Sequence, residues 1–378
     1  MVYNKFKGLD ISALGVGTMR YPIIDGKEEQ IDVEQAREMI AYAMEQGINY
    51  YDTAWGYHAG NSELVTGELL KEYPRESFYL ASKFPGYDVS NFGKVEEIFE
   101  KQLEKCQVDY FDFYLIHNVN EENIEYYLDD ATYHTVEYLL KQKENGRIRY
   151  LGFSFHGAYD VTKRYLETYG KYMEFAQIQL NWLDWTFQKA KEQVELLREY
   201  KLPIIVMEPL RGGKLAKLAE EDAAKLRRLR PEETVPGWSF RFLQAFPDVV
   251  TILSGMSDLE QTKQNIAIFQ TEAPLTKEET EALLEVAEDI QARTMMPCTA
   301  CRYCTPYCPK ELDIPSLLEA YNEHTFAGGG WMAQAMVGNQ PEGRRPWDCI
   351  GCRACEAVCP QKLVISEALA DFSKKLRP

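Results

Sequence analysis

The stretch Tyr51-Asp52-Thr53-Ala54-Trp55-Gly56-Tyr57-His58-Ala59-Gly60-Asn61-Ser62-Glu63 sets the pattern for the rest of the chain. It follows Gly47-Ile48-Asn49-Tyr50, an apolar run that predicts a short strand. Asp52 is therefore expected at a strand end and Tyr57 in the loop beyond it. A carboxylate and a phenol on adjoining turns form the start of a proton-donating site if a cation lies beside them. The alternative explanation is a polar loop that carries two surface aromatic residues.

The composition restricts the partners that this chain can bind. Its 378 residues are 45% hydrophobic and 27% charged, with a net charge of −17. Nucleic acid and anionic membrane surfaces both attract basic proteins, so this acidic balance argues against either partner. The segment Met1-Val2-Tyr3-Asn4-Lys5-Phe6 does not resemble a secretory signal, and no apolar run approaches the ~20 residues of a membrane span. We expect a soluble, cytoplasmic protein.

Continuous apolar runs recur along most of the chain and alternate with amphipathic segments. Runs without polar alternation are typical of parallel strands that are buried on both faces. The predicted strands are Ala13–Thr18, Ile48–Thr53, Phe78–Lys83, Phe111–His117, Tyr150–Ser154, Phe175–Leu180, Ile204–Met207 and Val249–Ser254.

The segments between these runs predict helices. The first helix has Asp32 as its N-cap, Gln35 three residues later, and Gly47 as a stop signal. The long crossover Lys214–Phe246 predicts two helices, broken near Pro231 and Pro236. The other predicted helices are Ser62–Glu72, Phe92–Cys106, Tyr133–Asn145, Tyr159–Tyr169, Ala190–Tyr200 and Lys277–Arg293.

Eight strand–helix units in succession predict a closed (β/α)8 TIM barrel rather than an open doubly wound sheet. No Gly-x-Gly-x-x-Gly motif follows the first strand, which removes the main signal for the open alternative. A short hairpin is expected before the barrel, at Phe6-Lys7-Gly8-Leu9-Asp10-Ile11-Ser12. The composition changes at Met295-Met296-Pro297. We therefore predict a barrel domain at residues 1–293 and a small, mostly helical domain at 294–378.

Candidate catalytic side chains fall at the carboxyl ends of three neighbouring predicted strands, where barrel enzymes do their chemistry. Asp52 and Tyr57 follow the second strand, Lys83 ends the third and His117 ends the fourth. A phenol has a pKa of about 10 and is a weak acid at neutral pH unless a nearby ammonium lowers that pKa. Lys83 can supply this charge, Asp52 can hold Lys83, and His117 can orient a carbonyl oxygen. Taken singly, each residue is more simply explained as structural or solvated.

The chain resembles the aldo-keto reductase family over roughly residues 5–290. The resemblance rests on Asp52-Thr53-Ala54 with Tyr57, on Asn61-Ser62-Glu63, on Ser82-Lys83 and on His117. It implies reduction of an aldehyde or ketone, or oxidation of the alcohol, with Tyr57 as general acid. Asp52, Lys83 and His117 would complete a catalytic tetrad, and a nicotinamide cofactor, NAD(P)H, would donate the hydride.

The same resemblance implies where the cofactor would bind. Gly152-Phe153-Ser154 is similar to the segment that holds the carboxamide, although Phe155-His156 stand where the family often has Asn. Many members also have an aromatic residue where Met207 or Glu208 stands. The implied cofactor residues are Ser154, Gln177, Pro209, Leu210, Gly212, Ser254, Gly255, Gln264 and Asn265, with Asn181 beside them.

The choice between NAD and NADP stays open at this point. NADP-preferring members carry an Arg or Lys after the eighth strand, because the 2′-phosphate is best matched by a cationic fork. This chain has Asp258 and Gln261 there, with Lys263 as the basic residue.

Eight of the nine cysteines fall between Cys298 and Cys359, in two Cys-x2-Cys-x2-Cys-x3-Cys-Pro runs. This spacing is typical of bacterial ferredoxins, in which the fourth cysteine of each run binds the other [4Fe–4S] cluster. Zinc is the alternative, but its sites are usually built from spaced pairs. We predict two clusters, one held by Cys298, Cys301, Cys304 and Cys359, the other by Cys308, Cys349, Cys352 and Cys355.

The remaining parts of this cassette suggest a module of a larger redox enzyme. A helix is expected at Ile314–His324, followed by a turn at Gly328-Gly329-Gly330, so the cassette resembles helical ferredoxin domains. Cys106 lies on a barrel helix and is expected to be a buried, small apolar side chain.

Three functions remain open from the sequence. The first is an NAD(P)H-dependent reductase of a small-molecule carbonyl, with clusters that serve structure or redox sensing. The second is a reductase whose clusters feed a flavin, a ferredoxin or a flavoprotein partner, because nicotinamide moves electron pairs and clusters move single electrons. The third is a cofactor-sensing binding module, which the complete tetrad argues against. We favour the first.

Overall fold

The computed structural model describes residues 1–298 and 300–377. The chain folds as two compact units, Met1–Leu283 and Leu284–Pro378. The border between the units falls inside helix α13 (Lys277–Thr294), whereas the predicted domain boundary, at residues 293 and 294, lies at the end of that helix. That boundary stays a prediction.

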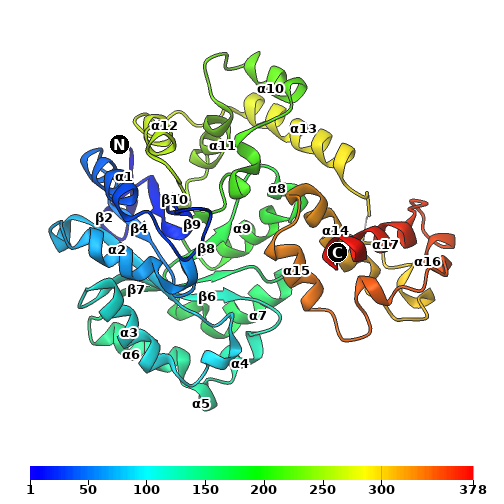
Figure 1. Ribbon diagram of the computed structural model, residues 1–378, viewed down its shortest axis with the longest axis horizontal. Coiled ribbons are helices and arrows are strands. Elements are labelled where there is room, and N and C mark those ends of the chain that lie inside the picture. Colours follow the sequence, from blue (N-terminus) through cyan, green and yellow to red (C-terminus); the bar gives the residue numbers. More distant parts are fainter. Residues whose placement is uncertain (299, 378) are drawn as a thin grey trace. The chain divides into compact units, whose positions relative to one another are not determined.

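The first unit is a closed barrel of eight parallel strands, which confirms the predicted fold (Figure 1). Each predicted strand is present, and its ends differ from the prediction by at most two residues. The order around the barrel is β10-β3-β4-β5-β6-β7-β8-β9. The strands are β3 (Leu14–Gly17), β4 (Tyr50–Asp52), β5 (Tyr79–Phe84), β6 (Phe111–Val119), β7 (Ile148–Phe155), β8 (Ala176–Gln179), β9 (Ile204–Met207) and β10 (Val249–Ser254).

The pairing register brings the carboxyl ends of β4, β5 and β6 to the same rim. Asp52 pairs with Ala81 of β5, and Lys83 of β5 pairs with Leu115 of β6. All strands run in one direction, so polar residues at their ends meet at that rim rather than being divided between the two ends of the barrel.

A hairpin closes the opposite, amino-terminal end of the barrel. Strands β1 (Tyr3–Phe6) and β2 (Leu9–Ser12) pair antiparallel, and the two residues between them, Lys7 and Gly8, have φ of 46° and 89°. Positive φ at both positions is typical of a type I′ turn, which favours glycine. The Phe6 ring is buried and packs against the rings of Phe113 and Phe175 inside the barrel, with centroids 5.2 and 6.3 Å away.

Helices surround the strands (Figure 1). Helix α1 begins after Asp32, whose side chain accepts a hydrogen bond from the Gln35 amide as predicted. The helices of this unit are α1 (Val33–Glu45), α2 (Ser62–Leu70), α3 (Val95–Cys106), α4 (Ile124–Leu128), α5 (Asp130–Tyr133), α6 (Thr135–Glu144), α7 (Tyr159–Tyr169), α8 (Asp184–Phe187), α9 (Ala190–Glu199), α10 (Glu220–Arg227), α11 (Val235–Gln244) and α12 (Leu259–Ile268), with α13 at the border. The short helices α4, α5 and α8 were not predicted.

The long crossover holds the two predicted helices, α10 and α11, but only one of the two prolines separates them. Pro231 lies between the helices, whereas Pro236 lies in the first turn of α11. A proline is tolerated there because the first backbone N–H groups of a helix have no partner within it. Thr234 is the N-cap and accepts a hydrogen bond from the Gly237 amide at 3.0 Å.

The second unit is mainly helical. Its helices are α14 (Ile314–Ala327), α15 (Trp331–Gly338), α16 (Ala354–Ala357) and α17 (Ile365–Leu376). The three glycines between α14 and α15 have φ of 67°, 102° and 121°, so the predicted turn is present. Its core is formed by Leu312, Leu317, Leu318, Val337, Leu369 and Phe372, with the buried Cys304 and Cys355.

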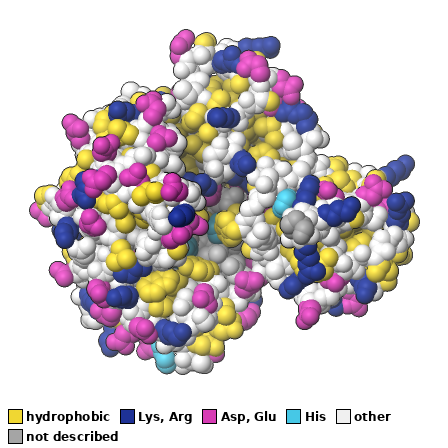
Figure 2. Space-filling model, in the orientation of Figure 1, with side chains coloured by type: hydrophobic (Ala, Val, Ile, Leu, Met, Phe, Trp, Pro, Cys, Tyr) yellow, Lys and Arg dark blue, Asp and Glu magenta, His cyan; other side chains and the backbone are white. Residues whose placement is uncertain are grey.

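On the face shown in Figure 2, the barrel unit carries acidic and basic side chains that are interspersed rather than separated into patches of one sign. Among the described residues, no helix has both the length and the apolar character needed to cross a membrane.

Candidate functional site

Four predicted side chains meet at the carboxyl-terminal rim of the barrel. Asp52 is the last residue of β4, Lys83 lies one residue before the end of β5, and Tyr57 begins the turn η2 (Tyr57–Gly60). His117 lies within β6, which extends two residues beyond the predicted end. The rings of Tyr57 and His117 are in edge-to-face contact, with centroids 6.2 Å apart.

Lys83 is the centre of this group and is completely buried. Its Nζ atom donates hydrogen bonds to Asp52 Oδ1 at 2.5 Å and to the Thr53 carbonyl at 2.8 Å. A third, longer contact of 3.5 Å joins it to the Tyr57 hydroxyl. Burial lowers the pKa of Lys83, but the interactions with Asp52 and Tyr57 together raise it by more, so the net shift is upward and the ammonium stays charged.

The pKa of Tyr57 differs from the expectation. Burial raises this pKa, and the Lys83 ammonium lowers it only in part, so the net shift is upward rather than downward. Asp52 and Glu208 add to the rise. The sequence showed which cation lies beside the phenol, but the cost of removing a phenolate from water depends on the folded surroundings. Tyr57 therefore stays protonated over the neutral range.

His117 is held neutral. Burial, with the Lys83 charge beside it, lowers the pKa of His117 well below its ordinary value. Its Nδ1 atom is buried and has no hydrogen-bond partner among the described residues. A buried polar atom without a partner costs free energy unless a ligand satisfies it, which suits a side chain at a binding site.

The residues expected near the carboxamide lie inside the barrel mouth but already contact protein groups. The Ser154 hydroxyl accepts a hydrogen bond from the Asn118 amide at 2.9 Å. Gln177 Nε2 donates to Asp52 Oδ2 at 3.0 Å, so Gln177 holds the carboxylate that in turn holds Lys83. His156, where the family often has Asn, is partly buried, and burial lowers its pKa to about 4.

The glycine loops after β9 and β10 lie against a side chain that was not predicted, Arg20 of the turn η1 (Thr18–Arg20). A Cβ atom on Gly212 would come within 2.8 Å of Arg20 Nη2, and one on Gly255 within 3.0 Å of Arg20 Cδ. Gly212 also has a φ of 64°. The backbone of Gly212 thus favours glycine, and a side chain at either position would displace Arg20 from the loops. Pro209 is buried, whereas Leu210 is half-buried.

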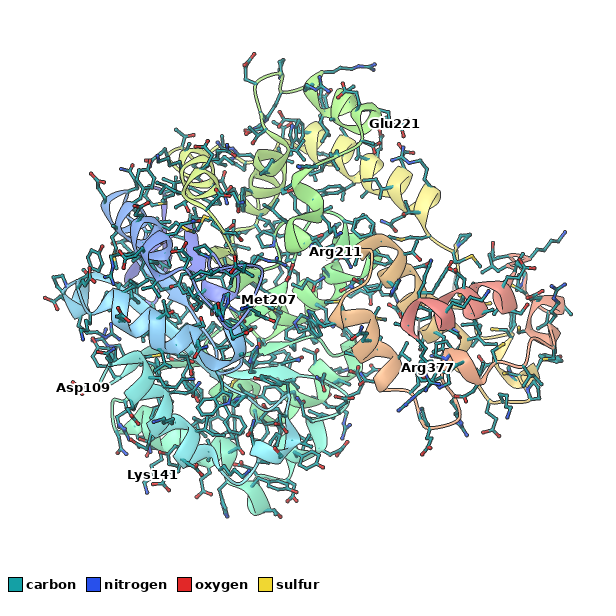
Figure 3. The ribbon with its side chains drawn as sticks, in the orientation of Figure 1. Asp109, Lys141, Met207, Arg211, Glu221 and Arg377 are labelled. Atoms are coloured by element: carbon teal, nitrogen blue, oxygen red, sulfur yellow. The ribbon has the colours of Figure 1, made fainter. Side chains whose placement is uncertain are left out.

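Met207 is the last residue of β9, and Glu208 directly follows it. Figure 3 labels Met207, which lies toward the centre of the barrel unit, whereas Asp109 and Lys141 lie on its periphery. Burial raises the pKa of Glu208, although Arg20 and the Gly212 amide oppose the rise. The Glu208 carbonyl accepts a hydrogen bond from Asn181 Nδ2 at 3.1 Å. The end of β9 therefore presents a thioether and a carboxyl group instead of an aromatic ring.

The segment after β10 is held by contacts within itself. Asn265 Nδ2 donates to Ser254 Oγ at 3.1 Å, and both side chains are buried. Gln264 donates to Glu260 on the exposed face of α12. Asp258 caps this helix by accepting from the Gln261 amide at 2.7 Å. The structure therefore brings Ser254 and Asn265 together and places Gln264 away from them, on the surface.

The eight clustered cysteines line two separate cavities in the second unit. Their grouping is the one predicted from the ferredoxin spacing. One cavity is lined by Cys298, Cys301, Cys304 and Cys359, and the other by Cys308, Cys349, Cys352 and Cys355. Within residues 1–298 and 300–377, no three His, Cys, Asp or Glu side chains converge closely enough to hold a single metal ion. The ninth cysteine, Cys106, is buried as expected.

Comparison with protein families decides the identity of the first unit. The family described as "Aldo/keto reductase family" matches residues 13–288. The chain belongs to this family. A second family, described as "4Fe-4S dicluster domain", matches residues 297–364, which include all eight clustered cysteines. The predicted aldo-keto reductase barrel, and the iron–sulfur domain that follows it, are therefore confirmed.

Three curated relatives cover 55% to 73% of this aldo-keto reductase. The "Uncharacterized oxidoreductase YqkF" of Bacillus subtilis is 26% identical over 306 residues, covering 73% of this chain and 92% of that protein. The "NADH-specific methylglyoxal reductase" of Escherichia coli is 25% identical over 323 residues, covering 73% and 96%. "Probable aldo-keto reductase 1" of Glycine max is 30% identical over 216 residues, covering 55% and 58%.

Solved aldo-keto reductases share the barrel. The holo form of AKR11C1 from Bacillus halodurans aligns with a TM-score of 0.60 and 26% identity, covering 76% of this chain and 95% of that one. An aldo/keto reductase from Klebsiella pneumoniae, solved with NADP and acetate, aligns with a TM-score of 0.61 at 20% identity, covering 76% and 95%. At 20% identity, the second alignment shows only that the fold is shared.

Tyr87 is another side chain beside His117, and it was not among the predicted site residues. Its hydroxyl lies against Gly56, where an added Cβ atom would come within 2.3 Å. Its ring is in edge-to-face contact with His117, with centroids 5.3 Å apart. Burial raises the pKa of Tyr87 to about 12. The available sequence signal was an aromatic residue in the loop that directly follows β5.

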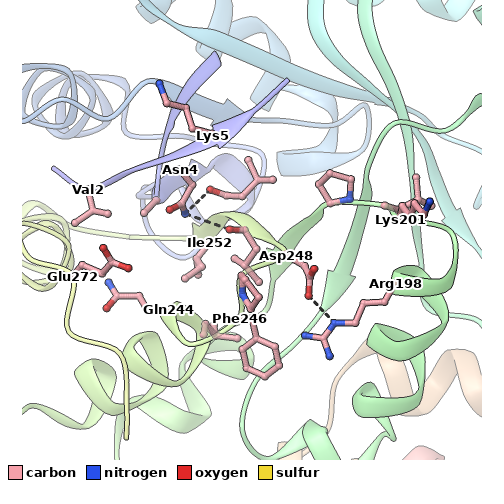
Figure 4. A pocket seen from close by; sticks show the side chains of 17 residues that line it. Val2, Asn4, Lys5, Arg198, Lys201, Gln244, Phe246, Asp248, Ile252 and Glu272 are labelled. Carbon is pink, nitrogen blue, oxygen red and sulfur yellow. Dashed lines mark hydrogen bonds and ion pairs between the residues drawn. The ribbon is translucent and has the colours of Figure 1, made fainter. Parts of the chain in front are cut away.

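A cavity of about 580 Å³ lies at the other end of the barrel (Figure 4). It is lined by residues of β1 and by the segments that lead into β9 and β10, and Arg198 and Asp248 form an ion pair across part of it. None of the four tetrad residues lines this cavity. It is separate from the rim where the reductase chemistry is expected.

Proposed function

We propose that this aldo-keto reductase reduces the carbonyl group of a small aldehyde or ketone, or oxidises the corresponding alcohol, with Tyr57 as general acid. The observation that carries the proposal is the buried Lys83, which contacts the Asp52 carboxylate and the Tyr57 hydroxyl at the ends of neighbouring strands. A charged ammonium beside a phenol is the arrangement that proton donation to a carbonyl oxygen requires.

Each residue of the tetrad has a separate task. The Tyr57 hydroxyl gives its proton to the carbonyl oxygen as that oxygen gains negative charge. Lys83 stabilises the phenolate that remains, and Asp52 keeps Lys83 charged and in place. Neutral His117 orients the carbonyl oxygen beside Tyr57. Gln177 of β8 holds Asp52 in turn, through a hydrogen bond to its carboxylate.

The barrel mouth fits a nicotinamide cofactor, which supplies a hydride to the carbonyl carbon when it is bound. The two glycine loops and Arg20 offer close backbone approach and a positive charge, which suit a pyrophosphate group. Ser154 and Gln177 would bind near the carboxamide, and Pro209, Leu210, Gly212, Ser254, Gly255 and Asn265 would hold the remainder. Gln264, which was also predicted, lies on the exposed face of α12 and is left out of this set. The name of the Escherichia coli relative supports NADH and a small dicarbonyl as starting points for assays.

The cysteine cavities fit two [4Fe–4S] clusters, which move one electron at a time when they are bound. Each cavity is lined by four thiols, the donor set that such a cluster takes. Eight thiols reserved for iron favour a reducing compartment, and we propose that the protein acts in the cytoplasm. We also propose residues 1–293 and 294–378 as the two domains.

A second candidate function is a reductase that exchanges single electrons with a ferredoxin or flavoprotein partner, or through a bound flavin. Two observations favour it over a purely structural role of the clusters. Cys301 and Cys352, one in each cavity, are exposed, so each cavity reaches the surface of its own unit. Met207 and Glu208 replace the aromatic residue that many family members stack on the nicotinamide.

One preparation tests these proposals. The protein is purified without oxygen, its iron and sulfide are counted, and any cofactor is released and identified. NADH-dependent reduction of a small dicarbonyl, reduced at least about 100-fold in Tyr57→Phe but unchanged in the surface variant Tyr172→Phe, supports the first function. Full activity of Tyr57→Phe contradicts it. A flavin in the extract, or activity only with reduced ferredoxin, supports the second.

A further inference from the structure

A second buried ion pair lies behind the tetrad, on the outer side of β5. Lys105 of α3 and Glu63 of α2 are joined by a 2.7 Å contact between Nζ and Oε2. Glu63 is fully buried, and Lys105 is only 8% exposed. Removing both charges from water is costly, so such a pair persists only where its geometry and its further hydrogen bonds are good.

Glu63 connects this ion pair to the strand that carries Lys83. Its Oε1 atom accepts hydrogen bonds from Ser82 Oγ and from Gln102 Nε2, each at 2.6 Å. Gln102 Nε2 also donates to the Lys83 carbonyl at 2.9 Å. Tyr114 donates to Gln102 Oε1, which fixes the orientation of this amide. The backbone of Ser82 and Lys83 is therefore held from outside the barrel.

Lys105 connects the same ion pair to the loop that carries Tyr57. Its Nζ atom lies 4.5 Å from the centre of the Trp55 ring, a cation–π contact. Trp55 lies two residues before Tyr57. Within the barrel, Lys83 donates to the Thr53 carbonyl at 2.8 Å. Two ammonium groups thus hold this loop, Lys83 at Thr53 from inside and Lys105 at Trp55 from outside.

We propose that Lys105 is a positioning residue, which keeps the Tyr57 hydroxyl within reach of the Lys83 ammonium through Trp55 on one side and Glu63 on the other. The proposal rests on the proposed function only in that Tyr57 is the proton donor. The contact between Tyr57 and Lys83 is 3.5 Å long, at the outer limit of a hydrogen bond. A small shift of the loop is therefore enough to break it.

Loss of the contact has a predictable effect on the phenol. The groups that face Tyr57 are Asp52 of β4, Lys83 of β5, His117 of β6, Tyr87 beyond β5, and Glu208 beyond β9. Lys83 is the one that lowers the pKa of Tyr57, while Asp52 and Glu208 raise it. Displacement from Lys83 therefore makes Tyr57 a weaker acid and a weaker proton donor.

The test uses the holoprotein with 13C-labelled tyrosine. The Cζ resonance of Tyr57, assigned by its loss in Tyr57→Phe, reports the contact between phenol and ammonium without any substrate. We expect this resonance in Lys105→Met and in Trp55→Leu to move toward its position in Lys83→Met. In Lys105→Arg, which keeps the charge over Trp55, we expect the Tyr57 resonance to lie at its wild-type position. Lys101→Met is the matched control, because Lys101 lies on the same helix in an exposed ion pair with Glu104.

Kinetics and stability separate positioning from a merely structural role. We expect kcat to fall about tenfold in Lys105→Met while KM changes less than about twofold, as for an interaction that matters in the transition state. Lys105→Met leaves Glu63 buried without its partner, so Glu63→Gln/Lys105→Met and Trp55→Leu serve if the single variant does not fold. An unmoved Tyr57 resonance in folded variants overturns the proposal, whatever their melting temperature. A moved resonance without carbonyl reduction by the wild type overturns the proposed function alone.

Discussion

The Lys83 ammonium and the Asp52 carboxylate form a buried ion pair of 2.5 Å between neighbouring strands. Removing one partner of such a pair leaves the other charge buried, which costs about 3–5 kcal/mol. We predict that Lys83→Met lowers the free energy of unfolding by an amount in this range. We also predict that it lowers kcat. Asp52→Asn/Lys83→Met should recover most of the stability and none of the activity. Denaturant unfolding and kcat measured on the same samples check this, and recovered activity would contradict the role of Lys83.

The raised pKa of Tyr57 predicts opposite pH profiles for the two directions of the reaction. Reduction needs the protonated phenol, which persists at every pH below this pKa, so its rate should not fall between pH 7 and 9 through loss of the donor. Oxidation needs the phenolate, so its rate should rise about tenfold per pH unit across this range. Initial rates in both directions, at saturating cofactor, check the prediction. An oxidation rate that levels off below pH 9 would show that the pKa is not raised.

The division of cysteines between the two cavities predicts which double variants keep a cluster. Cys301 and Cys359 line the same cavity although they come from different runs, so Cys301→Ser/Cys359→Ser should retain about half of the iron. Cys352→Ser/Cys359→Ser alters both cavities and should lose nearly all of it. Iron and sulfide analysis with low-temperature EPR distinguishes them. Cys106→Ala is the control, since this buried thiol lies in the barrel. If each run instead held its own cluster, the two double variants would exchange their results.

The residues after β10 predict that NADH binds more tightly than NADPH. The segment from Ser254 to Asn265 contains two acidic residues, Asp258 and Glu260, and one basic residue, Lys263, whose Nζ atom lies 5.8 Å from the centre of the Tyr42 ring. Asp258→Asn keeps the cap of α12, because Asn is also a good N-cap, but removes the charge. We expect it to strengthen NADPH binding about fivefold, as for loss of a repulsion of about 1 kcal/mol, and to leave NADH binding unchanged. Fluorescence titration measures both dissociation constants, with Glu278→Gln as control. A wild type that prefers NADPH would refute the prediction.

The barrel and the tetrad could be predicted from the sequence because their signals are local. Each strand is an apolar run of its own, and Asp52, Lys83 and His117 each stand at the end of such a run. Parallel pairing then brings the three ends together without any further information. The cysteine grouping was equally accessible, because it depends on spacing.

Other parts of the site depend on contacts between distant segments and could not be predicted. Arg20 follows β3 and has no motif of its own, yet its side chain lies against Gly212 and Gly255. Gln177 was expected to face the cofactor, and the sequence cannot reveal that its amide is bound to Asp52. The predicted direction of the Tyr57 pKa shift was wrong for a related reason. The shift depends on how much water the folded rim excludes from the phenol.

The mixed origin of the two cysteine cavities also determines when each one can be completed during synthesis. Neither run supplies four lining thiols alone, since one cavity needs Cys359 and the other combines Cys308 with the later run. During synthesis, therefore, neither set of four thiols is complete until the second run has been translated. By then the whole barrel has been translated, so on the proposed cluster assignment iron loading is completed late, and we predict that the barrel unit folds without it.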